Sequence, residues 1–449
     1  MLPQPRAPSE ALSRARAGSP LRSHGREGRV GPEGAYVLST QTAADLSRRS
    51  VVRGWTVVAG AFAVMFVTFG CTYTFTAFFA SLQQEFGVSR GALSWVFSVA
   101  AALYFLLGAV SGPLADRYGP RAVVLFGTAA VGVGLMLAGR ADAVWQVYVA
   151  YGVGVGVGVG FSYVPAIGAV QRWFVAQRGL ASGIAVSGIG VGTLAVPPVA
   201  DWIIAAHGWR AAYLTLGVFC VVAGGAAALL VEGSPQRRGF LPDGQVAVSA
   251  STRPAILDGL SVRDALASRP FALMYGAAFL VSLGLFTPFV HLAPYAEDHG
   301  LPHGLAVALF ALIGIGSTLG RFFIGGVADR LGRRRSLCAM YVGLAVAMLW
   351  WLASTQAWQI GLFALVFGAC YGGFVALAPA LIVDYFGPRN ASSLIGLAYT
   401  AVAFGTLGGP PLAGYAFDAT GSYTLPIAFT AAAALAGAAL IRLAPEPTP

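Results

Sequence analysis

Long apolar stretches alternate with short polar segments from about residue 54 to residue 443. A helix needs about 20 predominantly apolar residues to cross roughly 30 Å of hydrocarbon. Twelve stretches meet this requirement, and we place them near 54–82, 93–115, 121–139, 144–170, 179–204, 210–231, 270–296, 304–327, 335–353, 358–385, 391–417 and 422–443. A backbone in hydrocarbon must satisfy its hydrogen bonds internally, so the pattern predicts an all-α integral membrane protein with twelve transmembrane helices.

The polar segments divide the twelve spans into two halves. We expect a six-helix N-terminal half at 51–231, a cytoplasmic linker at 232–268 that is rich in Ser, Gly, Pro and Arg, and a six-helix C-terminal half at 269–443. Residues 1–50 lack an apolar core and are predicted to form a disordered, Arg-rich cytoplasmic tail without the apolar region of a signal peptide. Residues 444–449 form a short second tail.

Composition and charge fit this topology. Hydrophobic residues make up 57% of the 449 residues and charged residues only 10%, whereas about a quarter is typical of soluble domains. All 28 basic residues are arginine; 24 fall on the side of the predicted N-terminus and three, Arg90, Arg140 and Arg210, on the other. This positive-inside bias predicts cytoplasmic termini, in a bacterial inner membrane. The net charge of +10 therefore requires no nucleic-acid partner.

The same inventory argues against an enzyme. A Walker A loop and a Schiff-base site both need a lysine, and the chain has none. The four cysteines have no CxxC spacing and the five histidines form no HExxH motif, so we expect no metal, disulfide framework or cofactor.

The two halves repeat at a constant offset in the sequence. GPLADRYGPR begins at Gly112 and GGVADRLGRR at Gly325, and the same offset carries the Pro197–Pro198 pair onto Pro410–Pro411. Parallel six-helix repeats are a transporter architecture in which the substrate binds between the halves near the midplane. The recurring charged residues of the two short loops are predicted to gate alternating access. They are Asp116, Arg117 and Arg121 in the first loop and Asp329, Arg330 and Arg334 in the second.

Arg321 lies inside the span at 304–327. A charge near the centre of a membrane helix costs roughly 2.5–3.5 kcal/mol on insertion scales, so it indicates a functional site. Alternatively its long stem could lift the guanidinium to the headgroups. The equivalent position in the first half is Gly108. The fold therefore does not need an arginine here, which favours a role in binding.

Four other residues in the spans are candidates for the same pocket. Tyr73, Tyr163 and Tyr371 could each give a hydroxyl to a carboxylate, although tyrosines in spans more often pack or lie at the interface. His291, in the outer third of its span, could bind substrate, carry a proton or be hydrogen-bonded in place.

The segment YGVGVGVGVGF at 151–161 has a glycine at every second position. No strand–helix context supports a dinucleotide-binding loop. Small residues on several faces of a membrane helix permit close packing, and we expect them to serve that purpose here.

The paired GxxxADRxGxR-type loops resemble those of the major facilitator superfamily, over residues 54–443. Finer features resemble the monocarboxylate transporter branch and its oxalate/formate antiporter relatives: Arg-Gly-Trp at 53–55, RWFVAQRGLASGIAVSGIGVG at 172–192 and FTPFVHLAPYAEDHG at 286–300. In that branch an arginine on helix eight holds the substrate carboxylate, and Arg321 stands at the matching position. The resemblance therefore implies a transporter of small organic anions.

Two positions depart from the family pattern. The lysine that animal members carry on helix one corresponds to Ala77, and the acidic residue one turn before the arginine corresponds to Ser317. A lysine that the oxalate exchangers carry on helix eleven is also missing. A single cation in the cavity favours a monocarboxylate over a dicarboxylate.

These features together predict a secondary transporter of a monocarboxylate that works by proton symport or anion exchange. Its expected partners are the anion, protons and membrane lipid, with no obligate protein partner. The alternatives are a drug or metabolite efflux pump, in which Arg321 would contact an acidic group of a larger molecule, and a membrane sensor that binds without transporting.

Overall fold

The computed structural model describes residues 40–174, 177–235, 243, 260–387 and 390–445. The chain divides into two units, Met1–Asp45 and Leu46–Pro449. Of the first unit only 40–45 are described, and they are helical. The predicted tail therefore lies mostly outside the described residues. Helix α1 begins at Thr40, ahead of the predicted span, because neither Pro nor Gly interrupts 40–53.

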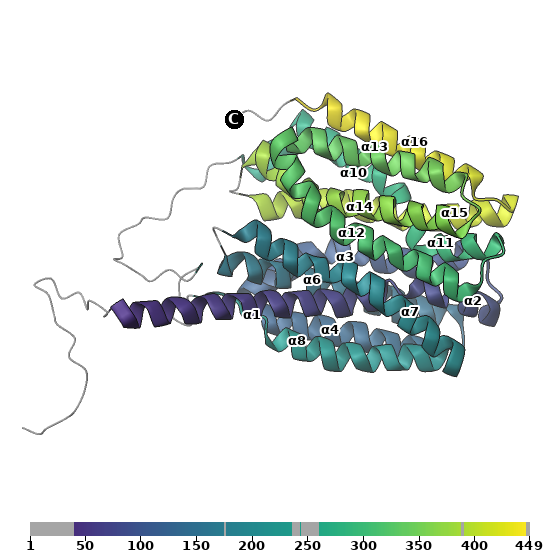
Figure 1. Cartoon of the computed structure of the whole chain (residues 1–449), viewed down its shortest axis with the longest axis horizontal. Coiled ribbons are helices and arrows are strands. Elements are labelled where there is room, and N and C mark those ends of the chain that lie inside the picture. The colour runs from purple at the N-terminus through teal and green to yellow at the C-terminus, as the bar shows by residue number, and fades with distance from the viewer. Residues whose placement is uncertain (1–39, 175–176, 236–242, 244–259, 388–389, 446–449) are drawn as a thin grey trace, which may run out of the picture. The chain divides into compact units, whose positions relative to one another are not determined.

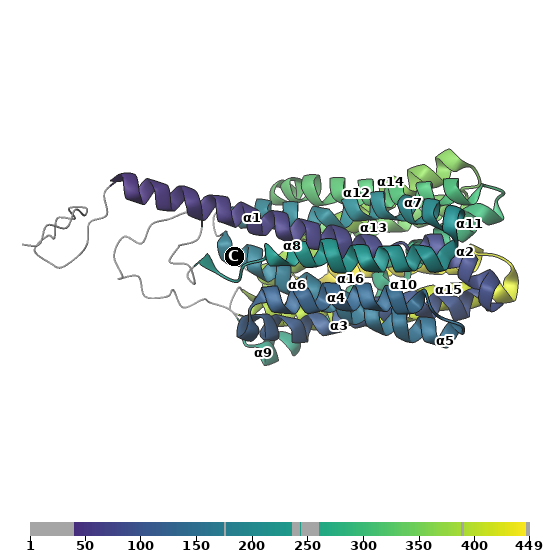
Figure 2. The ribbon, with the colours of Figure 1, turned by 90° about the horizontal axis from the view of Figure 1, so that it is seen from below.

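The regular secondary structure among the described residues of the N-terminal half is helical. Its elements are α1 (Thr40–Thr72), α2 (Phe75–Phe86), α3 (Arg90–Tyr118), α4 (Pro120–Ala138), α5 (Val144–Val147), the π-helical turn η1 (Tyr148–Val155), α6 (Gly156–Trp173), α7 (Arg178–Phe219), the π-helical turn η2 (Cys220–Gly224) and α8 (Gly225–Leu229). These helices run along a common direction and pack side by side (Figure 1; Figure 2).

The C-terminal half lies alongside, in green and yellow in Figure 1. It contains α9 (Val262–Leu266), α10 (Arg269–Leu285), α11 (Thr287–Asp298), α12 (His303–Leu331), α13 (Arg333–Leu352), α14 (Ala357–Phe386), α15 (Ala391–Thr420) and α16 (Thr424–Leu443). Of the predicted linker, only its two ends and residue 243 are described, and α9 lies in the second end.

The described residues contain 11 helical segments long and apolar enough to span a membrane. One of them, 179–229, covers two predicted spans. At 51 residues it would extend roughly 77 Å as a straight helix, more than twice the hydrocarbon thickness. Gly208 interrupts it with φ 82° and ψ 163°, a conformation that glycine adopts readily. The chain turns there, which gives the twelve predicted transmembrane helices.

The repeat is visible in the backbone. Gly119 has φ 87° and ψ 141°, and its equivalent in the second half, Gly332, has φ 90° and ψ 134°. The first helix of each half is also broken at equivalent positions, between Thr72 and Phe75 and at Phe286. Interrupted helices at corresponding positions of two halves mark the substrate site in many transporters. The breaks therefore point to the middle of the bundle.

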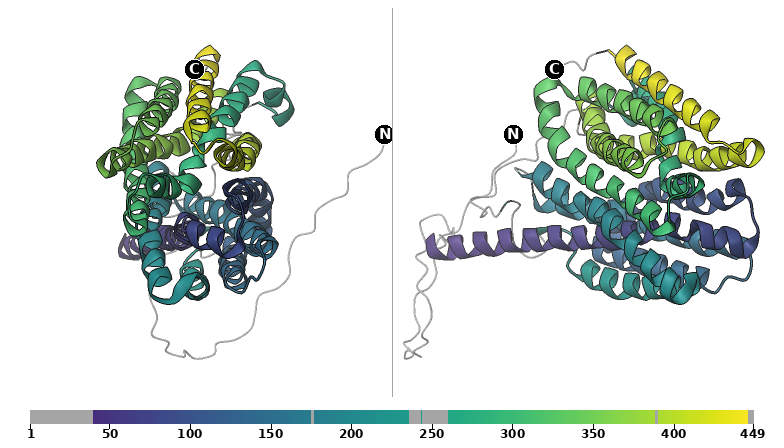
Figure 3. Two further views of the ribbon diagram at one scale, coloured as in Figure 1. Left: turned by 90° about the vertical axis from the view of Figure 1, so that its right-hand side faces the viewer. Right: turned by 45° about the vertical axis from the view of Figure 1, so that its right-hand side comes forward.

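The two halves meet along α3–α15, α7–α12 and α2–α11. Small residues allow the backbones to approach closely. A Cβ on Gly414 would lie 2.6 Å from the Gly91 Cα, and one on Gly314 would lie 2.3 Å from the Gly190 carbonyl oxygen. Seen end-on in Figure 3, the N-terminal helices form one bundle and the C-terminal helices the other.

The glycine-rich segment packs as predicted. A Cβ on Gly156 would lie 2.8 Å from the Ala100 oxygen of α3, and one on Gly158 would lie 2.5 Å from the Val131 nitrogen of α4. Successive alternate glycines thus face two neighbouring helices. This brings α6 close to both and fixes the part of α6 that carries Tyr163.

Candidate functional site

Arg321 is buried in the middle of the protein. Only 7% of its surface is exposed, and none of its three guanidinium nitrogens has a hydrogen-bond partner among the described residues. An unpaired buried charge is expensive, so it requires an explanation. The structure does not support snorkelling, because a lifted guanidinium would be hydrated.

Close packing of α12 on α14 sets the position of Arg321. A Cβ on Gly316 would lie 2.1 Å from the Leu365 oxygen, and one on Gly320 would lie 2.1 Å from the Ala369 oxygen. These contacts bring the two helices together over the turn that precedes Arg321. As a result the guanidinium carbon lies 5.8 Å from the centre of the Tyr371 ring on α14, within cation–π range.

Three tyrosines interact with the guanidinium. Arg321 interacts electrostatically with the hydroxyl groups of Tyr163 on α6, Tyr371 on α14 and Tyr399 on α15. The structure thus brings two of the predicted tyrosines to Arg321 and adds Tyr399, which sequence reasoning missed. Tyr163 comes from the N-terminal half and the other two from the C-terminal half. Arg321 therefore interacts with residues of both halves.

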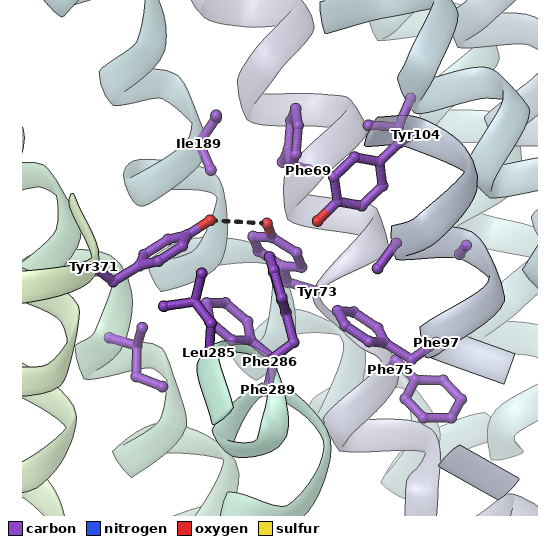
Figure 4. Packing of buried hydrophobic residues seen from close by; sticks show 14 of the residues in the cluster. Phe69, Tyr73, Phe75, Phe97, Tyr104, Ile189, Leu285, Phe286, Phe289 and Tyr371 are labelled. Carbon is purple, nitrogen blue, oxygen red and sulfur yellow. Dashed lines mark hydrogen bonds between the residues drawn. The ribbon is translucent and has the colours of Figure 1, made fainter. Parts of the chain in front are cut away.

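Tyr73 joins this group through Tyr371. Their hydroxyl oxygens lie 3.3 Å apart, and Figure 4 shows the Tyr104 hydroxyl pointing toward the same place. Tyr73 is fully buried at the break between α1 and α2. Tyr371 lies on α14, so this hydrogen bond crosses from one half to the other.

Ring contacts link the tyrosines into one aromatic cluster. Tyr163 contacts Phe69, which contacts Tyr104, with ring centres 5.7 and 5.8 Å apart. Phe105 then lies 4.5 Å from Tyr104, 5.6 Å from Tyr399 and 5.9 Å from Phe286. Phe286 closes the chain 6.1 Å from Tyr371. We call these seven side chains the aromatic cage: Phe69, Tyr104, Phe105, Tyr163, Phe286, Tyr371 and Tyr399.

Sequence reasoning found only part of the cage. Phe69, Tyr104, Phe105, Phe286 and Tyr399 were not predicted, because an aromatic residue in an apolar span gives no sign of which face of the helix it occupies. One signal was available for Phe286. It is the equivalent of Tyr73 in the second half, at the corresponding helix break, and is followed by Thr287 and Pro288.

His291 lies in a different cluster. Its Nε2 is 2.9 Å from the Pro410 oxygen and 3.2 Å from Ser94 Oγ, and its Nδ1 is 3.0 Å from the Tyr423 hydroxyl. Both ring nitrogens therefore have partners. These contacts join α11 to α3, α15 and the segment before α16 beside Arg90. The structure does not bring His291 to Arg321.

Hydrogen bonds and ion pairs join the two halves at one end of the bundle. This end carries Arg90, Asp298 and Asp418 and is called the Arg90 end. The Arg90 guanidinium donates to both carboxylate oxygens of Asp298. Asp418 accepts from the backbone nitrogens of Arg90 and Gly91 at 3.0 and 2.8 Å. His303 also contacts Asp201 across the halves at 3.1 Å.

At the opposite end, here called the linker end, some contacts of the described charges stay within one half. Arg121 lies 3.6 Å from Glu232, and Arg334 donates to the backbone oxygens of Arg442 and Ala444. Arg117 and Arg330 are exposed. The side chains of Asp116 and Asp329 lie outside the described residues. The predicted gate therefore remains a prediction.

The two positions that depart from the family pattern are both buried. Ser317 lies one turn before Arg321, and its hydroxyl has no hydrogen-bond partner among the described residues. Ala77 is fully buried on α2. Within the part of the chain that the structure describes, no ion pair reaches Arg321 and no group of three His, Cys, Asp or Glu residues could hold a metal.

Two small apolar cavities lie within the C-terminal half. One is lined by residues such as Val281, Leu344 and Phe367. The other lies between α10, α13, α14, α15 and α16 and is bordered by Tyr341, Phe374 and Tyr399. Neither is lined by a charged residue, so neither explains Arg321.

Comparison with known proteins agrees with this architecture. The sequence model of the Major Facilitator Superfamily matches residues 60–327 and 304–449. The chain is 29% identical over 397 residues to monocarboxylate transporter 12-B of Danio rerio, covering 83% of this chain and 82% of that protein. It is 27% identical over 397 residues to an aspyridones efflux protein of Emericella nidulans, covering 86% and 77%.

The fold also matches a solved structure. A bacterial homologue of the human lysosomal transporter Spinster, solved in an inward-facing and unoccupied conformation, superposes with a TM-score of 0.61 at 14% identity, over 87% of this chain and 95% of that one. With the family match over most of its length, its twelve transmembrane helices and its relatives in the monocarboxylate transporter branch, this chain belongs to the Major Facilitator Superfamily and is an integral membrane transporter rather than an enzyme.

Proposed function

We propose that this protein is a secondary transporter of a small organic anion, a monocarboxylate, with Arg321 as the anion anchor. The observation that carries the proposal is the buried guanidinium without a partner among the described residues. An anion bound to Arg321 would contact residues of both halves.

A carboxylate would supply the hydrogen-bond acceptors and the negative charge that this guanidinium lacks among the described residues. An arginine can donate two parallel hydrogen bonds to the two oxygens of a carboxylate, and such charge-assisted pairs are roughly twice as strong as neutral ones. In this proposal the hydroxyl groups of Tyr163, Tyr371 and Tyr73 donate to the same anion. Neutralising the buried charge also lowers the cost of closing the site around it. His291 would contribute indirectly, through the contacts between the halves.

Relatives support this class of substrate. A protein named monocarboxylate transporter 12-B matches over 83% of the chain, and the single arginine favours one carboxylate over two. We propose proton symport or anion exchange as the coupling, in a bacterial inner membrane with both termini in the cytoplasm.

We propose that the protein works by alternating access, and the contacts between the halves at the Arg90 end support this. The described inter-half pairs lie at the Arg90 end, where Arg90 holds Asp298 and His303 contacts Asp201. We propose that these pairs separate when that end opens. The loop charges at the linker end would then bring the halves together there: Asp116, Arg117 and Arg121 with Asp329, Arg330 and Arg334.

Uptake into proteoliposomes tests the proposal. Radiolabelled lactate, pyruvate, formate and oxalate are supplied with and without an inward proton gradient. Stimulation of a monoacid by the gradient supports symport, whereas a requirement for internal anion supports exchange. Failure to move any acid in either format would overturn the assignment of a carboxylate substrate.

The variant Arg321→Ala tests the anchor. We expect it to abolish uptake while its abundance in the membrane stays normal, because the guanidinium has no hydrogen-bond partner among the described residues to lose. Arg210→Ala is the matched control, since Arg210 pairs at 2.9 Å with Glu85 within the N-terminal half. Uptake retained by Arg321→Ala would refute the role of Arg321.

Efflux of a larger acidic metabolite is the second candidate function. The match to an aspyridones efflux protein over 86% of the chain favours it, and Arg321 would then contact an acidic group of that molecule. Transport assays in both orientations, with resistance to acidic compounds in cells, separate export from uptake.

A further inference from the structure

We infer that the preferred substrate is a monocarboxylate with a bulky apolar tail, held by the aromatic cage while Arg321 binds its carboxylate. The inference rests on the proposed function and narrows it from any small organic anion to an amphipathic acid. It follows from the aromatic rings near the guanidinium and from the absence of a second cation among the described residues beside them.

The surroundings of the charge are aromatic. The Tyr371 ring lies 5.8 Å from the guanidinium carbon, and Tyr163 and Tyr399 interact with the same charge. Phe105 and Phe286 extend this wall away from Arg321, with ring centres 5.9 Å apart. A molecule whose carboxylate reached Arg321 would therefore place its remaining atoms against aromatic rings.

The polar groups of the cage are its four tyrosine hydroxyls, and the nearby Ser317 hydroxyl has no partner among the described residues. Arg321 is the one cation that lies over a ring of the cage among the described residues. A second carboxylate would be desolvated without a counter-charge, which is costly. A short acid would pair with the Arg321 guanidinium but would not contact the aromatic rings. An acid whose tail is roughly the size of one aromatic ring would do both.

The cage also spans both halves. Phe69, Tyr104, Phe105 and Tyr163 come from the N-terminal half, and Phe286, Tyr371 and Tyr399 from the C-terminal half. An apolar tail between them would contact both sets of rings at once. Tail contacts could then favour the state in which the halves close on the substrate, so we expect the tail to affect kcat/KM rather than binding alone.

The test compares acetate with phenylacetate, which share a carboxylate and differ by one ring. Initial rates are measured in proteoliposomes for both labelled acids, and benzylmalonate is added as a competitor with the same tail and two carboxylates. We expect kcat/KM for phenylacetate to exceed that for acetate by about tenfold or more, because even one methylene in an apolar pocket discriminates by about 10-fold or more. Benzylmalonate should compete poorly.

Phe105→Ala is the decisive variant, because Phe105 belongs to the cage through its contacts with other rings and leaves the tyrosines around Arg321 in place. We expect the ratio of kcat/KM for phenylacetate over acetate to fall about tenfold. The midpoint of thermal unfolding in detergent checks that the variant is folded. Phe126→Ala is the matched control: Phe126 pairs with Phe161 at 5.2 Å, is 53% exposed and lies outside the cage.

The outcomes separate this inference from the proposed function. Equal or better transport of acetate by the unmodified protein, or an unchanged ratio in Phe105→Ala, would overturn the inference and leave the monocarboxylate function standing. Transport of neither acid, together with no transport of lactate, pyruvate, formate or oxalate, would overturn the proposed function and the inference with it. Strong competition by benzylmalonate would contradict the single-carboxylate preference.

Discussion

Arg90 and Asp298 form a two-pronged ion pair that joins the N-terminal half to the C-terminal half. The two guanidinium nitrogens of Arg90 at the start of α3 lie 2.6 and 2.7 Å from the carboxylate oxygens of Asp298 at the end of α11. The same guanidinium donates to the Tyr423 hydroxyl at 2.9 Å and lies 4.1 Å from the centre of the Phe417 ring. One side chain thus contacts three segments of the other half.

We expect Arg90→Ala to open this end of the protein. Hydrogen bonds to charged groups contribute about 1.5–3 kcal/mol each, and partial exposure of the pair reduces that value, so the equilibrium between states should shift by about tenfold. Spin labels on cysteines at Asp142 and Thr420, in a background without the four native cysteines, report the distance between the halves. The distribution should move to longer distances.

Arg210→Ala is the control for this measurement. Arg210 and Glu85 also form an ion pair near this end, at 2.9 Å, but both belong to the N-terminal half, and their side chains are 43% and 41% exposed. Such pairs contribute about 0–1 kcal/mol, so the label distances should not change. An unchanged distribution in Arg90→Ala would show that the helix contacts alone hold this end together.

The sequence predicted the membrane spans because their length and apolarity are properties of each segment alone. It also predicted the repeat, since the loop motifs recur at a fixed offset. The division of 179–229 into two helices was placed correctly near Gly208, where a positive φ requires a glycine. Arg321 could be identified because a charge in an apolar span is rare for a physical reason.

The rest of the site depends on how the helices face one another. Phe105 and Tyr399 belong to opposite halves of the chain, and nothing in either apolar span distinguishes them from residues that face lipid. His291 shows the same limit: the sequence placed it in the outer third of its span, but its contacts with Ser94 and Pro410 depend on packing between the halves. Residues of unusual chemistry could therefore be predicted, and residues made functional by their orientation could not.

The hydroxyl pair of Tyr73 and Tyr371 gives a second prediction. If both hydroxyls donate to the substrate carboxylate, Tyr73→Phe and Tyr371→Phe should each raise KM about two- to tenfold, since a hydrogen bond contributes about 0.5–1.5 kcal/mol. Initial rates of monocarboxylate uptake measure this. Tyr213→Phe is the control, because the Tyr213 hydroxyl has no partner among the described residues and its ring stacks on Phe78 at 3.8 Å. A KM that stays constant in both site variants would remove these hydroxyls from the site.

Close packing at the glycine-rich segment gives a third prediction. Gly156→Ala would place a Cβ 2.8 Å from the Ala100 oxygen and 2.9 Å from its Cα. Backbone atoms cannot move away as a flexible side chain can, so we expect a loss of about 1–3 kcal/mol in the free energy of unfolding. Thermal unfolding in detergent measures it. Gly183→Ala, where nothing lies within 4 Å, should be neutral or slightly stabilising. A stability of Gly156→Ala equal to that of the control would show that α3 and α6 can separate at little cost.

The glycines that recur in the two loops give the last prediction. It separates an effect of backbone conformation on stability from an effect of the loop charges on transport. Gly332 has φ 90° and ψ 134° and has open space where a Cβ would lie. Gly332→Ala therefore tests backbone strain without a steric clash, and such strain costs on the order of 1–3 kcal/mol. Gly179→Ala is matched to it, since Gly179 also has open space but no positive φ.

We expect Gly332→Ala to lower the midpoint of thermal unfolding and Gly179→Ala to leave it unchanged. The uptake rate per folded molecule should be normal in both, because neither glycine carries a charge that could join the halves. Arg330→Ala, at an exposed arginine, should show the reverse pattern, with little effect on the midpoint and a slower rate. A normal midpoint together with slow uptake in Gly332→Ala would instead place this glycine in the conformational change itself.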